Sequence, residues 1–280
     1  MISANNNESL LVQAGRYSLV RNLKESSIYQ VSRSVSLFSE WLGREATITD
    51  LKGDTVSVWL QAIEEKLSPR TVAGHRVNLL GLWRFMAEDG LCEAPRQVRK
   101  VAKPDPLPIA WTMEELRALL QQAQEATGLM VDGTPWCIYW EATIRCAYDT
   151  GLRRSDLWIL RKDQIRPDGI QIRQAKTGRT HQPRLTARTL ELLRQIKHDP
   201  PLSWPGKNSR QWYVEWNLLV ARARIRPGAL QQIRRTGATH LYREHPEDVQ
   251  RYLGHRTPTM QRHYVDLSLA APQSNMPPEL

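Results

Sequence analysis

The side chains of this sequence that suit chemistry are arginines, lysines and one late tyrosine. Residues 253–266, LGHRTPTMQRHYVD, place Tyr264 nine positions after a histidine that follows a glycine, and no metal-ligand spacing accompanies the pair. Two stretches, residues 171–190 and 221–236, each hold five basic side chains and no acidic one. Guanidinium groups bind phosphate oxygens through paired hydrogen bonds and stay charged at any working pH. These stretches therefore favour phosphate binding, although charge alone also fits two solvated faces.

The composition points to the same kind of partner. The 280 residues carry a formal net charge of +10 and a pI near 9.8, which attracts polyanions such as nucleic acid. No apolar run approaches the roughly 18 residues of a membrane span, and the polar N-terminus lacks the pattern of a secretory signal. The three cysteines are irregularly spaced, which fits a reduced cytoplasmic protein without a disulfide framework or a zinc site. The length suggests two domains.

Helical patterns fill most of the first hundred residues. Residues 1–22 carry little pattern and are expected to form a loose leader. Apolar residues then recur at helical spacing in 28–42 and 51–66. Ser68 is a good N-cap, and Pro69 suits the first position of a third helix whose apolar face includes Val77. Residues 23–94 are therefore predicted to form a small helical bundle.

A basic, proline-rich segment follows the bundle. Residues 95–109 contain four prolines and four basic side chains, so they can form neither a helix nor a central strand. We interpret them as the linker between two domains. The second domain is expected over residues 110–267, with a patternless tail at 268–280.

The second domain is predicted to be helical except at one hairpin. Thr112 and Glu115 form the sequence pattern of a capping box, and a nearly continuous apolar helix is expected at 136–150, ended by a glycine. The apolar period then changes to two at Ile170 and Ile172, and the chain turns through KTGR. This change predicts a β-hairpin, after which helical patterns return.

Four motifs in this half of the chain occur in a specific order. They are TGLRRSDL with Arg153 and Asp156, KTGR with Lys176, QQIRRTGATHL with Arg234, and LGH with Tyr264 nine positions later. Their order and spacing resemble those of the tyrosine recombinases, the family of the phage integrases. The resemblance covers about residues 111–266, and LSPRTV more loosely resembles the start of a DNA-facing helix in that family's N-terminal domain. It implies a mainly α fold with a small β-hairpin, built from an N-terminal helical core-binding bundle and a C-terminal mixed α/β catalytic domain.

The resemblance also implies roles for the motif residues. Tyr264 would be the nucleophile that forms a covalent 3′-phosphotyrosine link, and Arg153 and Arg234 would hold the phosphate oxygens. Lys176 resembles the family's general acid for the departing 5′-hydroxyl, and His255 its phosphate contact. Asp156 resembles the acidic position that steadies the site in that family. The chemistry implied needs no metal and no nucleotide cofactor, and the sequence offers neither a carboxylate cluster nor a phosphate-binding P-loop.

The family pattern breaks at Gln231, which stands where the family has a histidine three residues before the second arginine. Glutamine can donate a hydrogen bond to phosphate but cannot carry a proton, so we interpret the change as tuning rather than inactivation. Arg173 and Arg179 flank Lys176 and remain alternatives for its role. Tyr252 is the nearest competitor of the nucleophile, but it precedes the histidine and is expected to pack.

Double-stranded DNA is the expected partner. The expected DNA contacts outside the motif residues are Arg70, Arg76, Arg96, Arg99, Lys100, Lys103, Arg173, Arg179 and Arg235. The resemblance further implies a homotetramer on paired DNA sites, with an accessory DNA-bending factor as an option, in the cytoplasm at the nucleoid. Two other functions stay open: a catalytically silent DNA-binding regulator, which Gln231 favours, and DNA relaxation like that of a type IB topoisomerase.

Overall fold

The chain forms two compact units, residues 1–106 and 107–280. The computed structural model describes residues 8–102, 107–204, 209–254, 257 and 262–270. Each unit buries its own cluster of hydrophobic side chains. The division lies inside the predicted linker, where proline-rich sequence offers little to pack.

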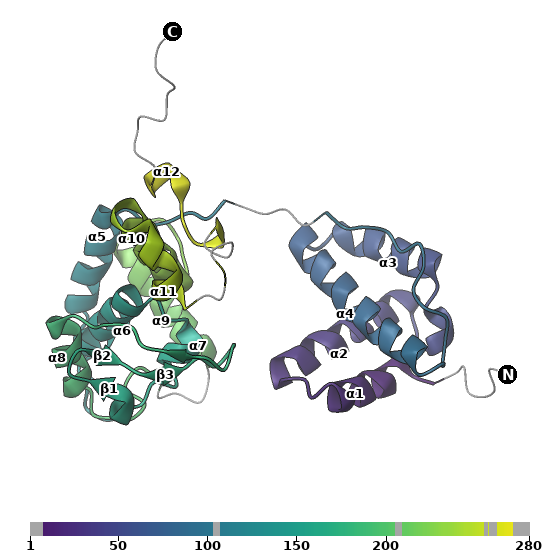
Figure 1. Cartoon of the computed structure of the whole chain (residues 1–280), viewed down its shortest axis with the longest axis horizontal. Coiled ribbons are helices and arrows are strands. Elements are labelled where there is room, and N and C mark those ends of the chain that lie inside the picture. Colours follow the sequence, from purple (N-terminus) through teal and green to yellow (C-terminus); the bar gives the residue numbers. More distant parts are fainter. Residues whose placement is uncertain (1–7, 103–106, 205–208, 255–256, 258–261, 271–280) are drawn as a thin grey trace, which may run out of the picture. The chain divides into compact units, whose positions relative to one another are not determined.

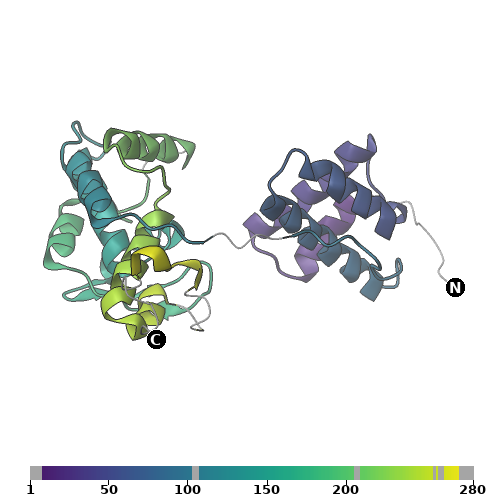
Figure 2. The same ribbon diagram turned by 90° about the horizontal axis from the view of Figure 1, so that it is seen from above.

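The N-terminal unit is a bundle of helices (Figures 1 and 2). They are α1 (Leu10–Val20), α2 (Glu25–Leu42), the short 3₁₀ helix η1 (Ile48–Asp50), α3 (Gly53–Glu64) and α4 (Pro69–Glu88). Helix α4 begins as predicted, because the Ser68 hydroxyl accepts a hydrogen bond from the Thr71 amide and Pro69 takes the first position. Phe38 and Trp59 are fully buried in the core of the bundle. Val77, which we predicted to lie on the buried apolar face of this helix, is instead 65% exposed.

The leader expected at residues 1–22 is wrong over α1. Ser9 caps this helix by accepting a hydrogen bond from the Leu11 amide, and Leu10 and Ala14 enter the core of the bundle. The apolar pattern is hard to detect because α1 also exposes Leu11 and Leu19 on its other side. Apolar side chains around most of the helix leave little periodicity to read.

The C-terminal unit is mostly helical. Its helices are α5 (Met113–Gln124), α6 (Trp136–Thr150), α7 (Arg154–Leu157), α8 (Ala187–Gln195), α9 (Ser209–Arg222), α10 (Gln231–Glu244), α11 (Val249–Leu253) and α12 (Leu267–Ala270), with 3₁₀ turns η2 (Lys162–Gln164) and η3 (Pro246–Asp248). Helix α6 is central, since it contacts α5, α8 and α10, which confirms the prediction of a buried helix (Figure 1). The predicted capping box of α5 is also present, with both of its hydrogen bonds. Helix α12 was not expected, and it lies where we predicted the start of the tail.

Two small antiparallel pairings form the β part of this unit. Strand β1 (Ile165–Arg166) pairs with β2 (Gly169–Ile170), and β3 (Ile172–Arg173) pairs with β4 (Thr180–His181). The Ile170 amide also donates to the Pro183 carbonyl at 3.0 Å, so the predicted hairpin continues past β3 and β4. Its turn carries Lys176, as the KTGR motif predicts.

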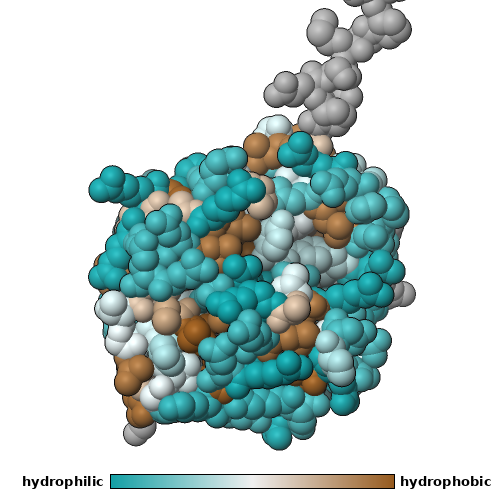
Figure 3. All heavy atoms as spheres, turned by 90° about the vertical axis from the view of Figure 1, so that its left-hand side faces the viewer, coloured by the Kyte–Doolittle hydropathy of each residue, from teal (hydrophilic) through white to brown (hydrophobic). Residues whose placement is uncertain are grey.

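The outer surface of the C-terminal unit is mainly hydrophilic on the side that Figure 3 shows, with small hydrophobic patches between polar side chains. Over the part of the chain that the structure describes, no helix is both long enough and apolar enough to cross a membrane.

Candidate active site

Arg234 is the buried centre of the predicted site. It lies on the first turn of α10 with no exposed surface, and its guanidinium donates to the backbone carbonyls of Gly151 and Leu253, the latter at 2.8 Å. These two bonds tie the ends of α6 and α11 to α10. Burial lowers the pKa of Arg234 to about 10, and the charge of Arg153 adds to this effect, while Tyr264 opposes it. The group therefore remains a cation near neutral pH.

Arg153 and Asp156 lie beside this centre. Gly151 ends α6 in the left-handed conformation, with φ of 59°, and the chain then turns to place Arg153 at the N-cap of α7. The Arg153 Nη1 atom lies 3.9 Å from Oδ2 of Asp156, whose side chain is fully buried. Neither atom has a hydrogen-bond partner among the described residues. The Arg153 cation, held beside Asp156, thus keeps a hydrogen-bond donor that no described residue uses.

Asp156 also fixes the hairpin that carries Lys176. Its Oδ1 atom accepts a hydrogen bond from the Ala175 amide at 2.8 Å, directly before Lys176. The turn itself is closed by the Gly178 amide, which donates to the Gln174 carbonyl at 2.8 Å. Through Asp156 the turn is therefore held near Arg153, and Lys176 is exposed.

Tyr264 reaches this cluster from a segment anchored to α10. The guanidinium carbon of Arg234 lies 4.8 Å from the centroid of the tyrosine ring. Directly after the tyrosine, Val265 is buried, and the Asp266 amide donates to Thr239 Oγ1 at 2.9 Å. The Asp266 carboxylate in turn accepts from the Ala110 amide at 2.9 Å. These contacts set where the phenol ring lies.

The other predicted site residues are placed less closely. Gln231 is the first residue of α10, one turn before Arg234, and is partly exposed. Arg173 donates from Nε to the Gly178 carbonyl at 2.7 Å, so it supports the turn, whereas Arg179 is exposed. The Arg235 Nε atom is buried and has no hydrogen-bond partner within the described part of the chain. His255 lies outside the described residues.

The predicted DNA contacts of the N-terminal unit differ in how they are held. Arg70, Arg96 and Lys100 are exposed, and Lys103 lies outside the described residues. Arg76, which we predicted to contact DNA, donates to the Arg99 carbonyl at 2.7 Å and so fastens the start of the linker to α4. The Arg99 side chain pairs with Glu64 at 2.6 Å.

Tyr252, the competing tyrosine, packs as expected. Its hydroxyl donates to the Tyr148 carbonyl at 2.7 Å. Its ring fills the space beside two glycines, since a β-carbon on Gly151 would lie 2.7 Å from the ring and one on Gly237 would collide with the hydroxyl. Burial raises the pKa of Tyr252 well above the usual value. This tyrosine joins α6, α10 and α11, and its hydroxyl already donates to a backbone carbonyl.

Two buried residues of the site escaped the sequence reasoning. Gln174 and His181 lie on the hairpin with 1% and 7% of their surface exposed, close to Gly254 at the end of α11. One signal was available for His181: in the antiparallel register it pairs with Ile172, an apolar residue predicted to face inward.

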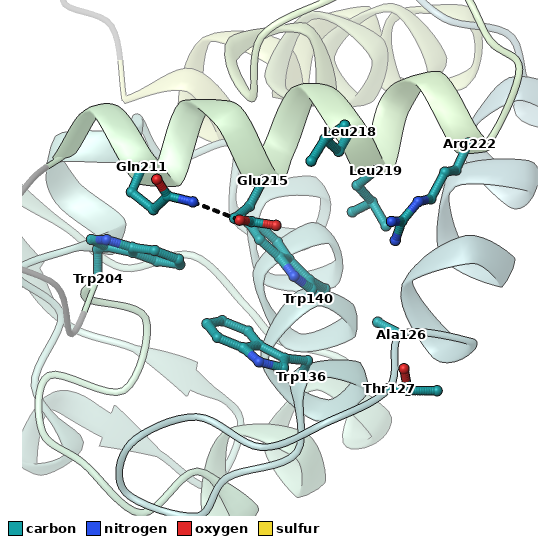
Figure 4. Close-up of a pocket in the computed structure, with 10 residues that line it drawn as sticks. All are labelled: Ala126, Thr127, Trp136, Trp140, Trp204, Gln211, Glu215, Leu218, Leu219 and Arg222. Carbon is teal, nitrogen blue, oxygen red and sulfur yellow. Dashed lines mark hydrogen bonds between the residues drawn. The ribbon is translucent and has the colours of Figure 1, made fainter.

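A tryptophan-lined pocket lies far from this cluster. Trp136, Trp140 and Trp204 wall a cavity of about 360 Å³ closed on one side by α9, where Gln211 donates to Glu215 (Figure 4). Trp136 begins α6, whereas the arginine cluster surrounds its other end, and 15 residues of helix span roughly 20 Å. The pocket and the polar cluster are therefore separate features of this unit. Among the described residues, one exposed group, His245, Glu247 and Asp248, has the spacing of metal ligands, and it is not in that cluster.

The fold of the chain is similar to those of known proteins. The fold is similar to those of a lambda integrase tetramer bound to a Holliday junction (TM-score 0.74, 16% identity, covering 99% of this chain and 82% of that chain) and of the XerH site-specific recombinase bound to a palindromic difH substrate (0.71, 18%, 93% and 82%). It is also similar to that of the Tn1549 transposon integrase with transposon right-end DNA (0.67, 16%, 95% and 95%). No curated protein sequence matches the chain. Residues 111–270 match the sequence profile of the Phage integrase family, and the chain belongs to that family.

Proposed function

We propose that this protein is a site-specific DNA recombinase that cuts and rejoins duplex DNA through a covalent 3′-phosphotyrosyl intermediate at Tyr264. The observation that carries the proposal is the placement of Arg234, buried and fixed by two backbone carbonyls, against the ring of Tyr264. A buried cation held in this way is already in position when charge develops on a phosphate, so no reorganisation is required.

The two arginines stabilise the transition state. When the Tyr264 oxygen attacks phosphorus, negative charge concentrates on the non-bridging oxygens, and guanidinium groups bind such oxygens with two parallel hydrogen bonds. Arg153 has a buried donor without a hydrogen-bond partner among the described residues, which suits an incoming acceptor. Arg235 offers a second buried donor of this kind on α10.

Lys176 assists the leaving group. In the proposed step the P–O5′ bond breaks as the bond from phosphorus to the Tyr264 oxygen forms, the phenol proton passes to solvent, and the lysine ammonium gives a proton to the 5′-oxygen. Asp156 positions both groups for this step, because one of its carboxylate oxygens lies near Arg153 and the other accepts from the amide of Ala175. Rejoining reverses each movement, so the phosphodiester energy is conserved in the tyrosyl ester.

Gln231 is also compatible with two other functions. Its amide donates a hydrogen bond to phosphate at the proposed position but cannot relay a proton. A catalytically silent DNA-binding regulator would tolerate this change, and DNA relaxation without strand exchange would use the same chemistry. The intact set of Arg153, Arg234, Lys176 and Tyr264 favours the recombinase.

The proposed partners are duplex DNA and further copies of the chain. Lambda integrase has been solved as a tetramer on a Holliday junction and XerH on its difH substrate. By similarity of fold, we propose that four copies of this chain exchange strands between two DNA sites at the nucleoid. His255 is proposed as a further phosphate contact, and the basic residues of the linker as contacts to the DNA backbone.

Two assays test this function. Incubation with nicked duplexes bearing sequences that the protein selects from its source genome should yield a protein–DNA adduct that survives denaturant. A silent regulator would bind the same duplexes without an adduct. Exchange between two labelled sites then separates recombination from relaxation, which needs a single duplex only.

A further inference from the structure

Gly254 at the end of α11 touches the hairpin that carries Lys176. A β-carbon at residue 254 would lie 2.6 Å from Nε2 of Gln174 and 3.1 Å from Nδ1 of His181. Both of these side chains are buried. Their Nε2 atoms have no hydrogen-bond partner within the described residues, so the contact with Gly254 is one of close packing. The bare backbone of Gly254 is therefore the surface on which the hairpin rests.

Gln174 connects this contact to the shape of the lysine turn. Its carbonyl accepts from the Gly178 amide and its side-chain oxygen from the Thr177 hydroxyl, each at 2.8 Å. The same residue therefore closes the turn that carries Lys176 and meets Gly254 on the other side.

The Gly254 side of this contact is connected to Arg234. Leu253, directly before Gly254, accepts a hydrogen bond from Arg234 through its carbonyl at 2.8 Å. One short path of described atoms thus runs from the lysine turn through Gln174 and Gly254 to Leu253 and Arg234. Asp156 holds the same turn from the α7 side through the Ala175 amide.

We propose that Gln174 and His181 are positioning residues that lock the Lys176 hairpin onto the Leu253–Gly254 end of α11. The lock fixes the distance between the proton donor for the 5′-oxygen and the arginine that holds the phosphate. This inference rests on the proposed function only for its catalytic consequence, because the contact itself is testable without DNA. Neither residue touches the reacting atoms, so the expected defect is in leaving-group protonation and not in phosphate binding.

Hydrogen exchange tests the contact. Gly254→Ala inserts a β-carbon against Gln174 and His181, and Gly43→Ala is its matched control: both glycines end a helix in the left-handed conformation, at φ of 59° and 70°, but nothing lies within 4 Å of a β-carbon at residue 43. We expect the amides of Gln174 and Gly178 to exchange about tenfold faster in Gly254→Ala, and to be unchanged in Gly43→Ala. Unchanged exchange in both variants would overturn the lock.

Single-turnover cleavage tests its consequence. Gln174→Met keeps the volume of the side chain but removes its amide. A substrate with sulfur in place of the bridging 5′-oxygen needs no proton from the protein, because thiols have a pKa of about 8.5. We expect Gln174→Met and Lys176→Ala to slow cleavage of the oxygen substrate by about 10²-fold or more, and sulfur to restore most of that rate. Arg153→Ala should stay slow on both substrates.

The outcomes separate the two proposals. Equal slowing of both substrates by Gln174→Met would contradict the positioning role and indicate general damage to the fold. If the wild-type protein cleaves neither substrate, the proposed function fails, while hydrogen exchange still decides whether the hairpin is locked to α11.

Discussion

The guanidinium carbon of Arg234 lies 4.8 Å from the centroid of the Tyr264 ring. The arginine belongs to α10, and the tyrosine reaches it from a later segment anchored by Asp266, so the two are adjacent only through the fold. Because Arg234 also bonds the ends of α6 and α11, any change that shifts one of these helices moves the cation relative to the phenol.

The position of Gln231 predicts a graded response to substitution. If its amide binds a non-bridging oxygen, Gln231→Ala should lower the cleavage rate by about 10²–10³-fold, the usual cost of a lost oxyanion donor. Gln231→His should stay within about tenfold of the wild type, because histidine can also donate. Single-turnover cleavage of a nicked substrate measures both. A Gln231→Ala protein as fast as the wild type at every pH would place residue 231 outside the site.

Two helical glycines predict opposite effects on stability. Gly237 of α10 faces the hydroxyl of Tyr252, with the Tyr148 carbonyl 3.2 Å from a β-carbon at this position, so Gly237→Ala should destabilise the C-terminal unit by about 1–3 kcal/mol. Gly74 of α4 has nothing within 4 Å, so Gly74→Ala should stabilise the N-terminal unit by about 0.5–1 kcal/mol. Urea denaturation followed by hydrogen exchange in each unit measures the two changes. A neutral Gly237→Ala would show that Tyr252 is not confined by α10.

The start of the linker predicts unequal salt effects on DNA binding. Neutralising the exposed Arg96 and Lys100 together should reduce the slope of log K against log salt by roughly two units, at about 0.9 per phosphate contact. Arg99→Gln should change the slope less, because Glu64 already neutralises that side chain at 2.6 Å. Binding titrations at several salt concentrations, on selected and random duplexes, give these slopes. Loss of affinity for one sequence alone, with the slope intact, would argue against backbone contacts.

His181 predicts a loss of stability in mild acid. Burial lowers the pKa of its imidazole, the charge of Arg234 adds to this, and Asp156 with the carbonyls of Thr150 and Tyr252 opposes it. As the pH falls through about 6.5, the unfolded chain binds a proton that the folded chain refuses, so stability decreases until the folded pKa is passed. Urea unfolding between about pH 7.5 and pH 5 should therefore show a steeper decrease for the wild type than for His181→Asn. Parallel curves for the two proteins would contradict a neutral buried imidazole.

Local sequence patterns predicted much of the fold. The Ser68–Pro69 start of α4, the Thr112–Glu115 capping box and the end of α6 at Gly151 follow from short-range hydrogen bonds and backbone preferences, which the sequence displays directly. Helix α1 was missed because only a narrow part of it reaches the core and its other sides are also apolar. Local patterns record which residues can be helical, but not which side will find a partner.

The order of the motifs predicted the residues of the candidate site, but not the tertiary contacts that hold these residues in place. Arg234 lies against the ring of Tyr264 and near the charge of Arg153, while the roles of the three residues stay a prediction. Their positions depend on contacts between residues far apart in the chain, such as the bond of 2.7 Å from Tyr252 to Tyr148 and that of 2.9 Å from Ala110 to Asp266. Such contacts follow from tertiary packing, for which a single sequence holds no local signal.

Covalent trapping with Tyr264→Phe tests the central claim most directly. The substitution removes one hydroxyl and no charge, so binding to a nicked duplex should match the wild type while the denaturant-resistant adduct disappears. Tyr252→Phe is the matched control: it removes the hydroxyl that bonds to the Tyr148 carbonyl and should still form the adduct. An adduct that persists in Tyr264→Phe and is lost in Tyr252→Phe would contradict the assignment of Tyr264 as the nucleophile.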